Sequence, residues 1–275
     1  MVYQNLGRGA LDYYPCRYGK SKLLLRGPKR KLDGPYVAVL GGTETYGKFV
    51  TRPFPQQIEE MLDHRVVNFG CVNAGIDVYV NDRTILEAAS KAAVTVVQLT
   101  GAQNLSNRFY AVHPRRNDRF LRASNLLKTI YRDVDFTEFS FTRHLLTSLH
   151  RVSPDRFAMV EQELKEAWVA RMKTLISKID GKIVLLWMAD HAPAGSESSS
   201  IQGSDPLFVG GEMINELRPF VTDVVEVRVT QAEIEAGHEG MVYSELEEPA
   251  ARAMLGTVAH ARAADSLEAA LRPHL

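Results

Sequence analysis

The fold is decided by residues 36–47, which read Tyr-Val-Ala-Val-Leu-Gly-Gly-Thr-Glu-Thr-Tyr-Gly. A short apolar run with two β-branched valines leads into two glycines and then a hydroxyl residue. This order is typical of the first strand of a parallel sheet, whose carboxyl end delivers a nucleophile or a phosphate-binding loop. We therefore expect the chemistry of the protein at this turn.

Further along the chain, short apolar runs alternate with amphipathic segments. The runs at 66–69 and 94–99 are β-branched and nearly continuous, as strands buried on both faces are. We predict five strands, at 36–40, 66–69, 94–99, 182–188 and 223–229. Helices are predicted at 55–64, 82–92, 157–179, 211–217 and 249–271. The pattern predicts an α/β fold with a five-stranded, doubly wound parallel sheet in a three-layer, flavodoxin-like arrangement.

Composition restricts the classes of partner. The chain has 275 residues, 45% hydrophobic, with 33 basic and 33 acidic side chains. This balance indicates neither a nucleic-acid partner nor a membrane surface. No run reaches the ~20 apolar residues of a membrane span and no secretory signal begins the chain, so we expect a cytoplasmic protein. Cys16 and Cys71 form no metal-binding set, so we expect reduced thiols, no metal and no cofactor.

Two segments are strongly basic. Residues 1–35 carry eight lysines and arginines against two aspartates, and we predict an arm outside the core. Such an arm covers a sheet edge, joins a homo-oligomer or binds an anion. Residues 36–275 form a single α/β domain with an insertion at about 101–154, placed over the carboxyl edge of the sheet. Its arginines make either a solvated helix face or a clamp of Arg115, Arg116 and Arg119 for phosphate, sulfate or carboxylate.

Three predicted strand ends carry a common pattern. Residues 41–47 read Gly-Gly-Thr-Glu-Thr-Tyr-Gly, residues 68–75 Asn-Phe-Gly-Cys-Val-Asn-Ala-Gly and residues 101–104 Gly-Ala-Gln-Asn. This order resembles the SGNH (GDSL-type) hydrolase superfamily, in which Gly-Asp-Ser-x-Thr-x-Gly, an Asn-x-Gly-like block and Gly-x-Asn-Asp follow the first three strands. The resemblance covers the central sheet but neither the arm nor the insertion. It implies a divergent family member that acts as an ester hydrolase or acyl transferase on a small, ester-like or anionic substrate.

The resemblance also implies roles for single residues. Thr43 takes the place of the nucleophilic serine, and Gly42 replaces the aspartate before it. Gln103 takes the place of the oxyanion-hole asparagine, and Asn104 that of the following aspartate. A threonine hydroxyl is a nucleophile when a base takes its proton. A glutamine amide donates the same hydrogen bond as asparagine from one methylene further out.

The second block leaves the oxyanion-hole donor open. Gly70, Asn73 or Gly75 could each supply the backbone N–H that the family uses there.

The base is also left open. The family's Asp-x-x-His is absent, and the nearest candidate is the pair Glu235 and His238, for which the alternative is a pair of surface side chains. His191, after the fourth strand, is the second candidate, and the adjacent Asp190 is expected to act through some other partner. Glu44 could act only if the turn points it into the pocket.

Two other histidines are assigned other roles. We expect His113 to be an anion ligand or a loop residue. We expect His260 to lie on the surface of a helix.

Two rival functions remain open. The first is a binding or structural protein that keeps the SGNH-like frame without the chemistry, because catalytic residues act as a unit. The second is sulfotransferase-like transfer from a nucleotide donor. Residues 113–124, His-Pro-Arg-Arg-Asn-Asp-Arg-Phe-Leu-Arg-Ala-Ser, resemble the arginine and serine element that holds a 3′-phosphate. The turn at 41–47 lacks the G-x-x-x-x-G-K-[ST] pattern of a P-loop.

Overall fold

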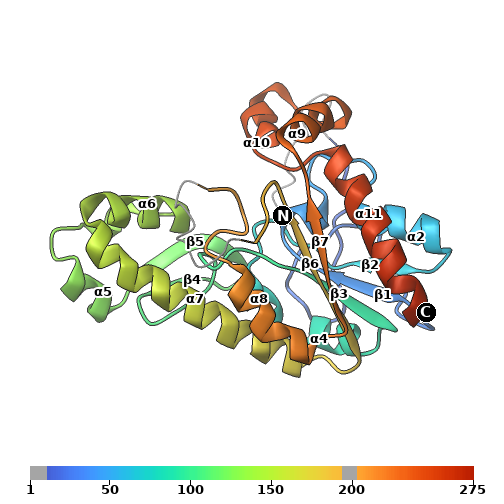
Figure 1. The fold of residues 1–275 in the computed structure, drawn as a ribbon, viewed down its shortest axis with the longest axis horizontal. Helices are drawn as coiled ribbons and strands as arrows, with labels where there is room; N and C mark the ends of the chain where they lie inside the picture. Colours follow the sequence, from blue (N-terminus) through green and yellow to red (C-terminus); the bar gives the residue numbers. More distant parts are fainter. Residues whose placement is uncertain (1–10, 194–202) are drawn as a thin grey trace.

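A five-stranded parallel sheet forms the centre of the protein (Figure 1). The computed structural model describes residues 11–193 and 203–275. The strand order is β2–β1–β3–β6–β7, the flavodoxin-like order predicted from the sequence. The strands are β1 (Val37–Leu40), β2 (Val66–Asn68), β3 (Val94–Gln98), β6 (Lys182–Ala189) and β7 (Asp223–Arg228).

Helices cover both faces of the sheet and make three layers (Figure 1). Alternation in β1 sends Val37 and Val39 to one core and Ala38 and Leu40 to the other. The first core lies under α2 (Phe54–Leu62) and α11 (Thr257–Leu271). The second lies under α3 (Ile76–Val80), α4 (Arg83–Ser90), α7 (Pro154–Ser177) and α8 (Gly211–Leu217).

The helix predicted at 249–271 is divided in two. The structure has α10 (Glu248–Arg252) and α11, with Gly256 between them as the N-cap of α11. A Cβ at Gly256 would lie 2.5 Å from the carbonyl oxygen of Gly237, at the end of α9 (Gln231–Gly237). The chain breaks here because two backbone segments touch, which the helical pattern of the sequence does not reveal.

The segment at about 101–154, predicted as an insertion over the carboxyl edge of the sheet, follows β3 and leads into α7. It contains an antiparallel hairpin of β4 (Tyr110–His113) and β5 (Arg116–Ala123), then α5 (Asn125–Ile130) and α6 (Thr142–Val152). Figure 1 shows α5 and α6 beside one end of α7, away from the sheet. Five 3-10 helices complete the described elements: Phe136–Glu138, Arg218–Phe220, His238–Gly240, Glu245–Glu247 and Arg272–His274. Within the described residues, no helix is both long and apolar enough to cross a membrane.

The basic arm is part of the core, and the prediction that it lies outside was wrong. Residues 1–10 fall outside the described part, but Leu23 and Leu25 are fully packed, and Tyr18 lies edge-on to Phe69 at 5.1 Å between ring centroids. Alternate residues of the segment face inward, while its lysines face outward. The net charge of the segment therefore did not reveal that one of its faces is apolar and buried.

Arg26 is the charged residue by which the arm holds the turn after β1. Its guanidinium group is buried and donates hydrogen bonds to the carbonyl oxygens of Gly47, at 2.7 Å, and Thr51, at 3.0 Å. Gly47 is the left-handed C-cap of α1 (Thr43–Tyr46), with φ 71°. Arg26 therefore neutralises the carbonyl end of the turn that the sequence singled out.

Candidate active site

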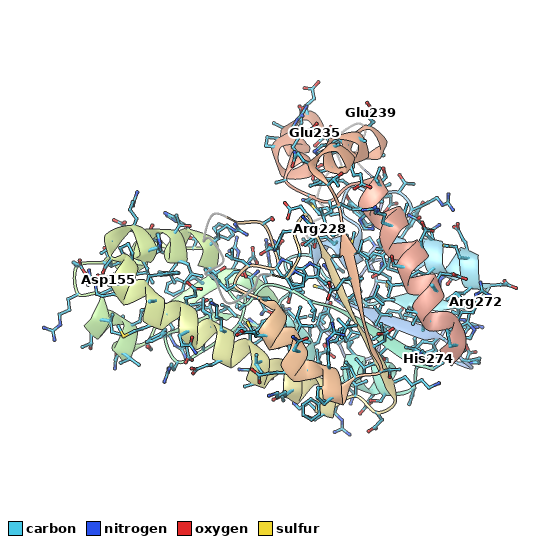
Figure 2. All side chains as sticks on the ribbon, viewed as in Figure 1. Asp155, Arg228, Glu235, Glu239, Arg272 and His274 are labelled. Carbon is cyan, nitrogen blue, oxygen red and sulfur yellow. The ribbon has the colours of Figure 1, made fainter. Side chains whose placement is uncertain are left out.

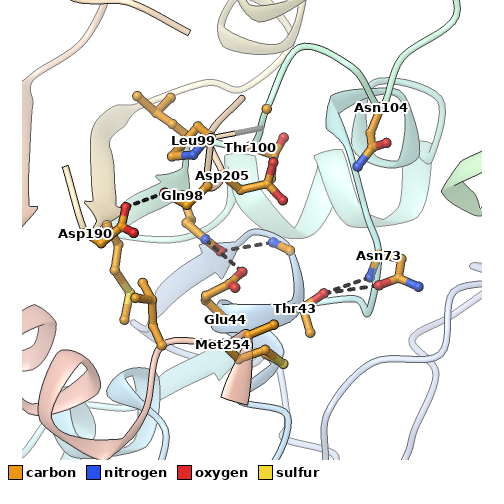
Figure 3. Close-up of a pocket in the computed structure, with 18 of the residues that line it drawn as sticks. Thr43, Glu44, Asn73, Gln98, Leu99, Thr100, Asn104, Asp190, Asp205 and Met254 are labelled. Carbon is orange, nitrogen blue, oxygen red and sulfur yellow. Dashed lines mark hydrogen bonds between the residues drawn. The ribbon is translucent and has the colours of Figure 1, made fainter. Parts of the chain in front are cut away.

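A cavity of about 630 Å³ opens at the carboxyl ends of the strands (Figure 3). Open parallel sheets place their ligand sites at this edge. The turn after β1 supplies Gly42, Thr43 and Glu44, the turn after β2 supplies Asn73, and the end of β3 supplies Gln98. The insertion adds Gly101, Asn104 and Arg143, and the loop before α8 adds residues 203–206. A partly apolar wall consists of Met188, Ile234, Met254 and Leu255.

Gln98 fixes the turn after β1. Its side-chain oxygen accepts hydrogen bonds from the Gly42 amide at 3.0 Å, the Thr45 amide at 3.2 Å and the Thr45 hydroxyl at 2.6 Å. Its amide nitrogen donates to the Glu44 carboxyl at 3.4 Å. A Cβ at Gly41 would lie 2.5 Å from this oxygen, so the first glycine makes room for the contact. The last residue of β3 thus sets the position of Thr43 and Glu44.

Replacing Gln98 with methionine is expected to lower the free energy of unfolding by about 3 kcal/mol, because a buried acceptor of three hydrogen bonds is lost while the volume is kept. Urea denaturation measures the change. Gln162→Met, on the exposed face of α7, is the matched control and should stay within about 0.5 kcal/mol of wild type. A Gln98 variant as stable as this control would show that the contacts do not fix the turn.

Thr43 is connected to a carboxyl group through Asn73. The Asn73 backbone N–H donates to the Thr43 hydroxyl oxygen at 3.0 Å, and the hydroxyl faces the Asn73 side-chain oxygen at 3.4 Å (Figure 3). The Asn73 amide nitrogen donates to Asp118, in β5, at 3.0 Å. Burial raises the pKa of Asp118, against the opposing field of Arg116. These contacts orient the Thr43 hydroxyl, but none of them can accept its proton.

Three carboxyl groups line the cavity, those of Glu44, Asp190 and Asp205. Glu44 points into it, which meets the condition set for this residue by the sequence (Figure 3). Burial, and then the charge of Asp205, raise the pKa of Glu44 above its ordinary value. Asp205 itself accepts hydrogen bonds from Gln103 at 2.7 Å and Arg143 at 3.3 Å. Glu44 and Asp205 therefore lie in different environments. Such a difference allows one carboxyl group to act as an acid and the other as a base.

Most of the backbone donors implied by the resemblance are already used. The Gly70 amide donates to the Asn68 side chain at 2.7 Å, and the Gly75 amide donates to Asn117 at 3.0 Å. Asn73 gives its backbone N–H to the Thr43 hydroxyl. These contacts lock the second turn.

The two amide side chains of the third block differ in where they point. Gln103 is 2% exposed and turns its amide nitrogen to Asp205. Asn104 lines the cavity, and its side-chain oxygen accepts from Thr142 at 2.7 Å. Figure 3 shows the Asn104 amide nitrogen directed toward the side of the cavity that holds Thr43. The Asn104 amide nitrogen, unlike that of Gln103, is thus directed into the cavity.

No histidine of the described residues lies in the wall of the cavity. All eight histidines of the chain fall in these residues. His238 contacts the carbonyl oxygen of Arg252 at 3.2 Å, and Glu235 accepts from Gln231 at 3.2 Å, so the proposed pair is not joined by a hydrogen bond. Figure 2 places Glu235 on the segment of α9 and α10, beyond the ends of the strands.

The second histidine candidate contacts its neighbour directly. The His191 ring nitrogen Nδ1 lies 2.6 Å from the Asp190 carboxylate, although adjacent side chains were expected to diverge. Asp190 directly follows Ala189, the last residue of β6, so it lies where the regular alternation of the strand ends. Ser204 donates to the same oxygen, and together these two partners hold the pKa of Asp190 below its ordinary value against the effect of burial.

His260 is buried, and the prediction of a surface histidine was wrong. It is fully enclosed between α11 and α2, and its Nδ1 accepts a hydrogen bond from the Phe54 amide at 3.1 Å. Its ring stacks on Phe54 with 5.8 Å between centroids. Burial lowers the pKa of His260 to about 3, so the ring is neutral and structural.

The predicted arginine clamp is not at this cavity. Arg115, Arg116 and Arg119 are absent from its wall, and Arg119 lies over the Phe141 ring at 5.5 Å. Two other arginines, Arg143 and Arg252, line it instead.

The rest of the basic element is occupied by local contacts. The hydroxyl of Ser124 caps α5 by accepting from the Leu127 amide at 3.2 Å. His113 is the last residue of β4 and not a loop residue, and its ring accepts from the Arg115 amide at 3.2 Å. The serine of the sulfotransferase-like element is thus engaged in a helix cap.

The fold and the cavity define an α/β protein of flavodoxin-like topology with a polar site at the carboxyl edge of its sheet. Residues 1–275 match the family described as "Domain of unknown function (DUF6473)", and the protein belongs to that family.

Solved structures include distant neighbours. The lipase Lip_vut3 from a goat rumen metagenome has a TM-score of 0.42 at 11% identity, over 86% of this chain and 97% of that one. The gut microbial diltiazem-metabolizing enzyme BT4096 has a TM-score of 0.37 at 11% identity, over 82% of this chain and 42% of that one. The chain thus spans less than half of the second neighbour. A comparison with curated proteins gives no match.

Proposed function

We propose that the cavity at the carboxyl edge hydrolyses or transfers an acyl group of an ester-like substrate, in the manner of a divergent SGNH-type protein. Thr43 is the acyl acceptor and Glu44 the proton-transfer group. The observation that carries the proposal is the Glu44 carboxyl group, which has a raised pKa and lies in the same cavity as the Thr43 hydroxyl, where no imidazole is present.

In this reaction, ionised Glu44 takes the proton of the Thr43 hydroxyl through one water molecule in the cavity, because the described contacts of the hydroxyl go to Asn73 and not to Glu44. The Thr43 oxygen bonds to the acyl carbon, the ester C–O bond breaks, and the leaving alkoxide takes the proton from Glu44. Water then repeats the sequence on the acyl-threonine. A carboxylate with a raised pKa is a stronger base than an ordinary one, so burial makes Glu44 better suited to this step. The Asn104 amide donates to the oxyanion.

The charged groups of the wall favour a polar substrate. Arg143 pairs with Asp205 at 3.3 Å, and Arg252 pairs with Glu248 at 2.7 Å. A carboxylate, sulfate or phosphate group on the substrate can replace these partners, in the role first assigned to Arg115, Arg116 and Arg119. The apolar side of the cavity, around Met188 and Met254, suits the acyl chain. The substrate class is thus a small ester with an anionic group.

A second candidate is a binding protein without chemistry. The observation that favours it is the Thr43 hydroxyl, whose hydrogen bonds in the described residues go only to Asn73. Asn73 cannot act as a base, so a ligand could be held here without covalent attack.

A panel of short-chain p-nitrophenyl esters separates the two candidates. Wild-type protein is expected to turn over at least one ester, and Thr43→Ala is expected to lose at least about 100-fold of this rate. Thr43→Ser should keep or increase it, because serine has the hydroxyl without the crowding methyl. No turnover of any ester, or equal rates for wild type and Thr43→Ala, would support the binding protein.

A further inference from the structure

A second cavity, of about 980 Å³, lies where the arm meets the insertion. Gly19, Lys20, Lys22 and Leu23 of the arm form one wall, and the start of α4 forms another. The turn between β4 and β5 closes it with Pro114 and Arg115. The basic side chains in its wall are Lys20, Lys22, Arg83 and Arg115. None of the residues of this cavity lines the candidate active site.

Two of the lysines of the arm, Lys20 and Lys22, line this cavity, and both are exposed. Lys20 lies in a turn that is closed by a hydrogen bond from the Ser21 amide to the Tyr18 carbonyl oxygen at 3.0 Å. The Ser21 hydroxyl donates to Asp82 at 2.6 Å, and the side chain of Leu23 is buried. The inward contacts hold these lysines in place, because the arm cannot slide without exposing Leu23.

The basic groups of this cavity exceed the acidic ones. Among the described residues, Lys20, Lys22 and Arg115 form no ion pair, and Arg83 pairs with Glu87 along its own helix at 2.7 Å. The other acid, Asp82, accepts from the Ile85 amide at 3.1 Å and from Ser21, so its charge is engaged at the start of α4. Three cations from two distant segments thus face one space without a partner.

We propose that this cavity binds an oligophosphate, either free or as the chain of an organic phosphate ester. The cations are exposed, and an exposed ion pair contributes little alone. A ligand held here therefore needs several anionic groups, spaced along a chain that reaches both the lysines and Arg115. Leu23 and Val78 of the wall are buried, so the cavity offers a ligand mainly charged and polar groups. The site is independent of the acyl chemistry proposed for the first cavity.

Calorimetric titration with tripolyphosphate at low salt tests the site. Wild type is expected to bind it, and the combined variant Lys20→Gln, Lys22→Gln and Arg115→Gln should bind at least 10-fold more weakly. The control combines Lys91→Gln, Arg122→Gln and Lys128→Gln, three exposed cations with the same charge change outside the cavity wall. It should stay within twofold of wild type. No binding by wild type, or equal loss in both variants, would overturn the proposal.

Residue-level protection gives a second readout on the unmodified protein. Lysine acetylation followed by mass spectrometry should show Lys20 and Lys22 protected by tripolyphosphate, with Lys128 unchanged. Calorimetric titration with ATP identifies the source of the phosphate chain. Tighter binding of ATP than of tripolyphosphate indicates an organic ester, and equal or weaker binding of ATP indicates the free chain. Protection spread evenly over all lysines would contradict a built site.

Discussion

Replacing Glu44 with glutamine is expected to lower ester turnover at neutral pH by about 100-fold or more, since a positioned proton-transfer group contributes 10²–10⁴-fold. The amide keeps the size of the side chain and can still bond Gln98, so the turn after β1 stays in place. What is lost is the group that takes the proton of Thr43. Initial rates on the best ester of the panel measure the effect.

The pH dependence of the same reaction tests the role of Glu44 more closely. Because its pKa is raised above the ordinary value of 4.5, ionised Glu44 appears only as the pH rises through that higher value. Wild-type turnover should rise over this range, and the small residual turnover of Glu44→Gln should lack this rise. Glu166→Gln, on the exposed face of α7, is the control with an unchanged profile. A wild-type profile shared by Glu44→Gln would exclude Glu44 as the base.

Lowering the pH from 7 to 4.5 is expected to remove several kcal/mol of stability through His260 alone. In the unfolded chain this ring binds a proton below pH 6.5, whereas in the folded protein its pKa is about 3. Between these values the unfolded state binds more protons, so stability falls as the pH falls, by about 1.4 kcal/mol for each unit. Urea unfolding at pH 7, 5.5 and 4.5 measures the slope.

The variant His260→Phe isolates this contribution. Phenylalanine keeps the stacking on Phe54 but cannot be protonated, so the variant is less stable at pH 7, through the lost Phe54 hydrogen bond, and has a flatter slope below pH 6.5. His144→Ala, an exposed histidine, should keep the wild-type slope. Glu44 acts in the opposite direction, because its raised pKa adds stability at low pH that is lost as the pH rises. Equal slopes for wild type and His260→Phe would contradict a neutral, buried ring.

The sheet could be predicted from the sequence because each strand is a short run of mostly apolar residues, which can be recognised without knowledge of tertiary contacts. The β-branched runs at Val66–Asn68 and Val94–Gln98 are followed within two residues by Gly70 and Thr100, and their alternation with helices leaves few topologies. The hairpin of the insertion was missed because it has few apolar residues, with only Asn117, Phe120 and Ala123 buried along β5. The arm was predicted to lie outside the core because its many basic residues were given more weight than the alternation that buries Leu23 and Leu25.

The site was predicted only where it follows a strand directly. Thr43, Asn73 and Asn104 line the cavity, as their places after strand ends indicated. Gln98 lines it too, and the feature that could have identified it is a polar residue at the end of a buried strand. Asp205 and Arg143 carry no such feature, because the chain brings them to the cavity from more distant segments. His260 was misplaced because the alanines around it give α11 little contrast between its buried and exposed faces.

Acid quenching of the reaction with a short-chain ester, followed by peptide mass spectrometry, tests the role of Thr43 most directly. The proposed chemistry predicts the mass of the acyl group on Thr43 in wild type and in Thr43→Ser, with accumulation in Glu44→Gln reduced because the attack itself is slowed. An acyl group on Thr100 or Ser204, which are hydroxyl residues of the same wall, or turnover that continues in Thr43→Ala without any acyl-threonine, would contradict it.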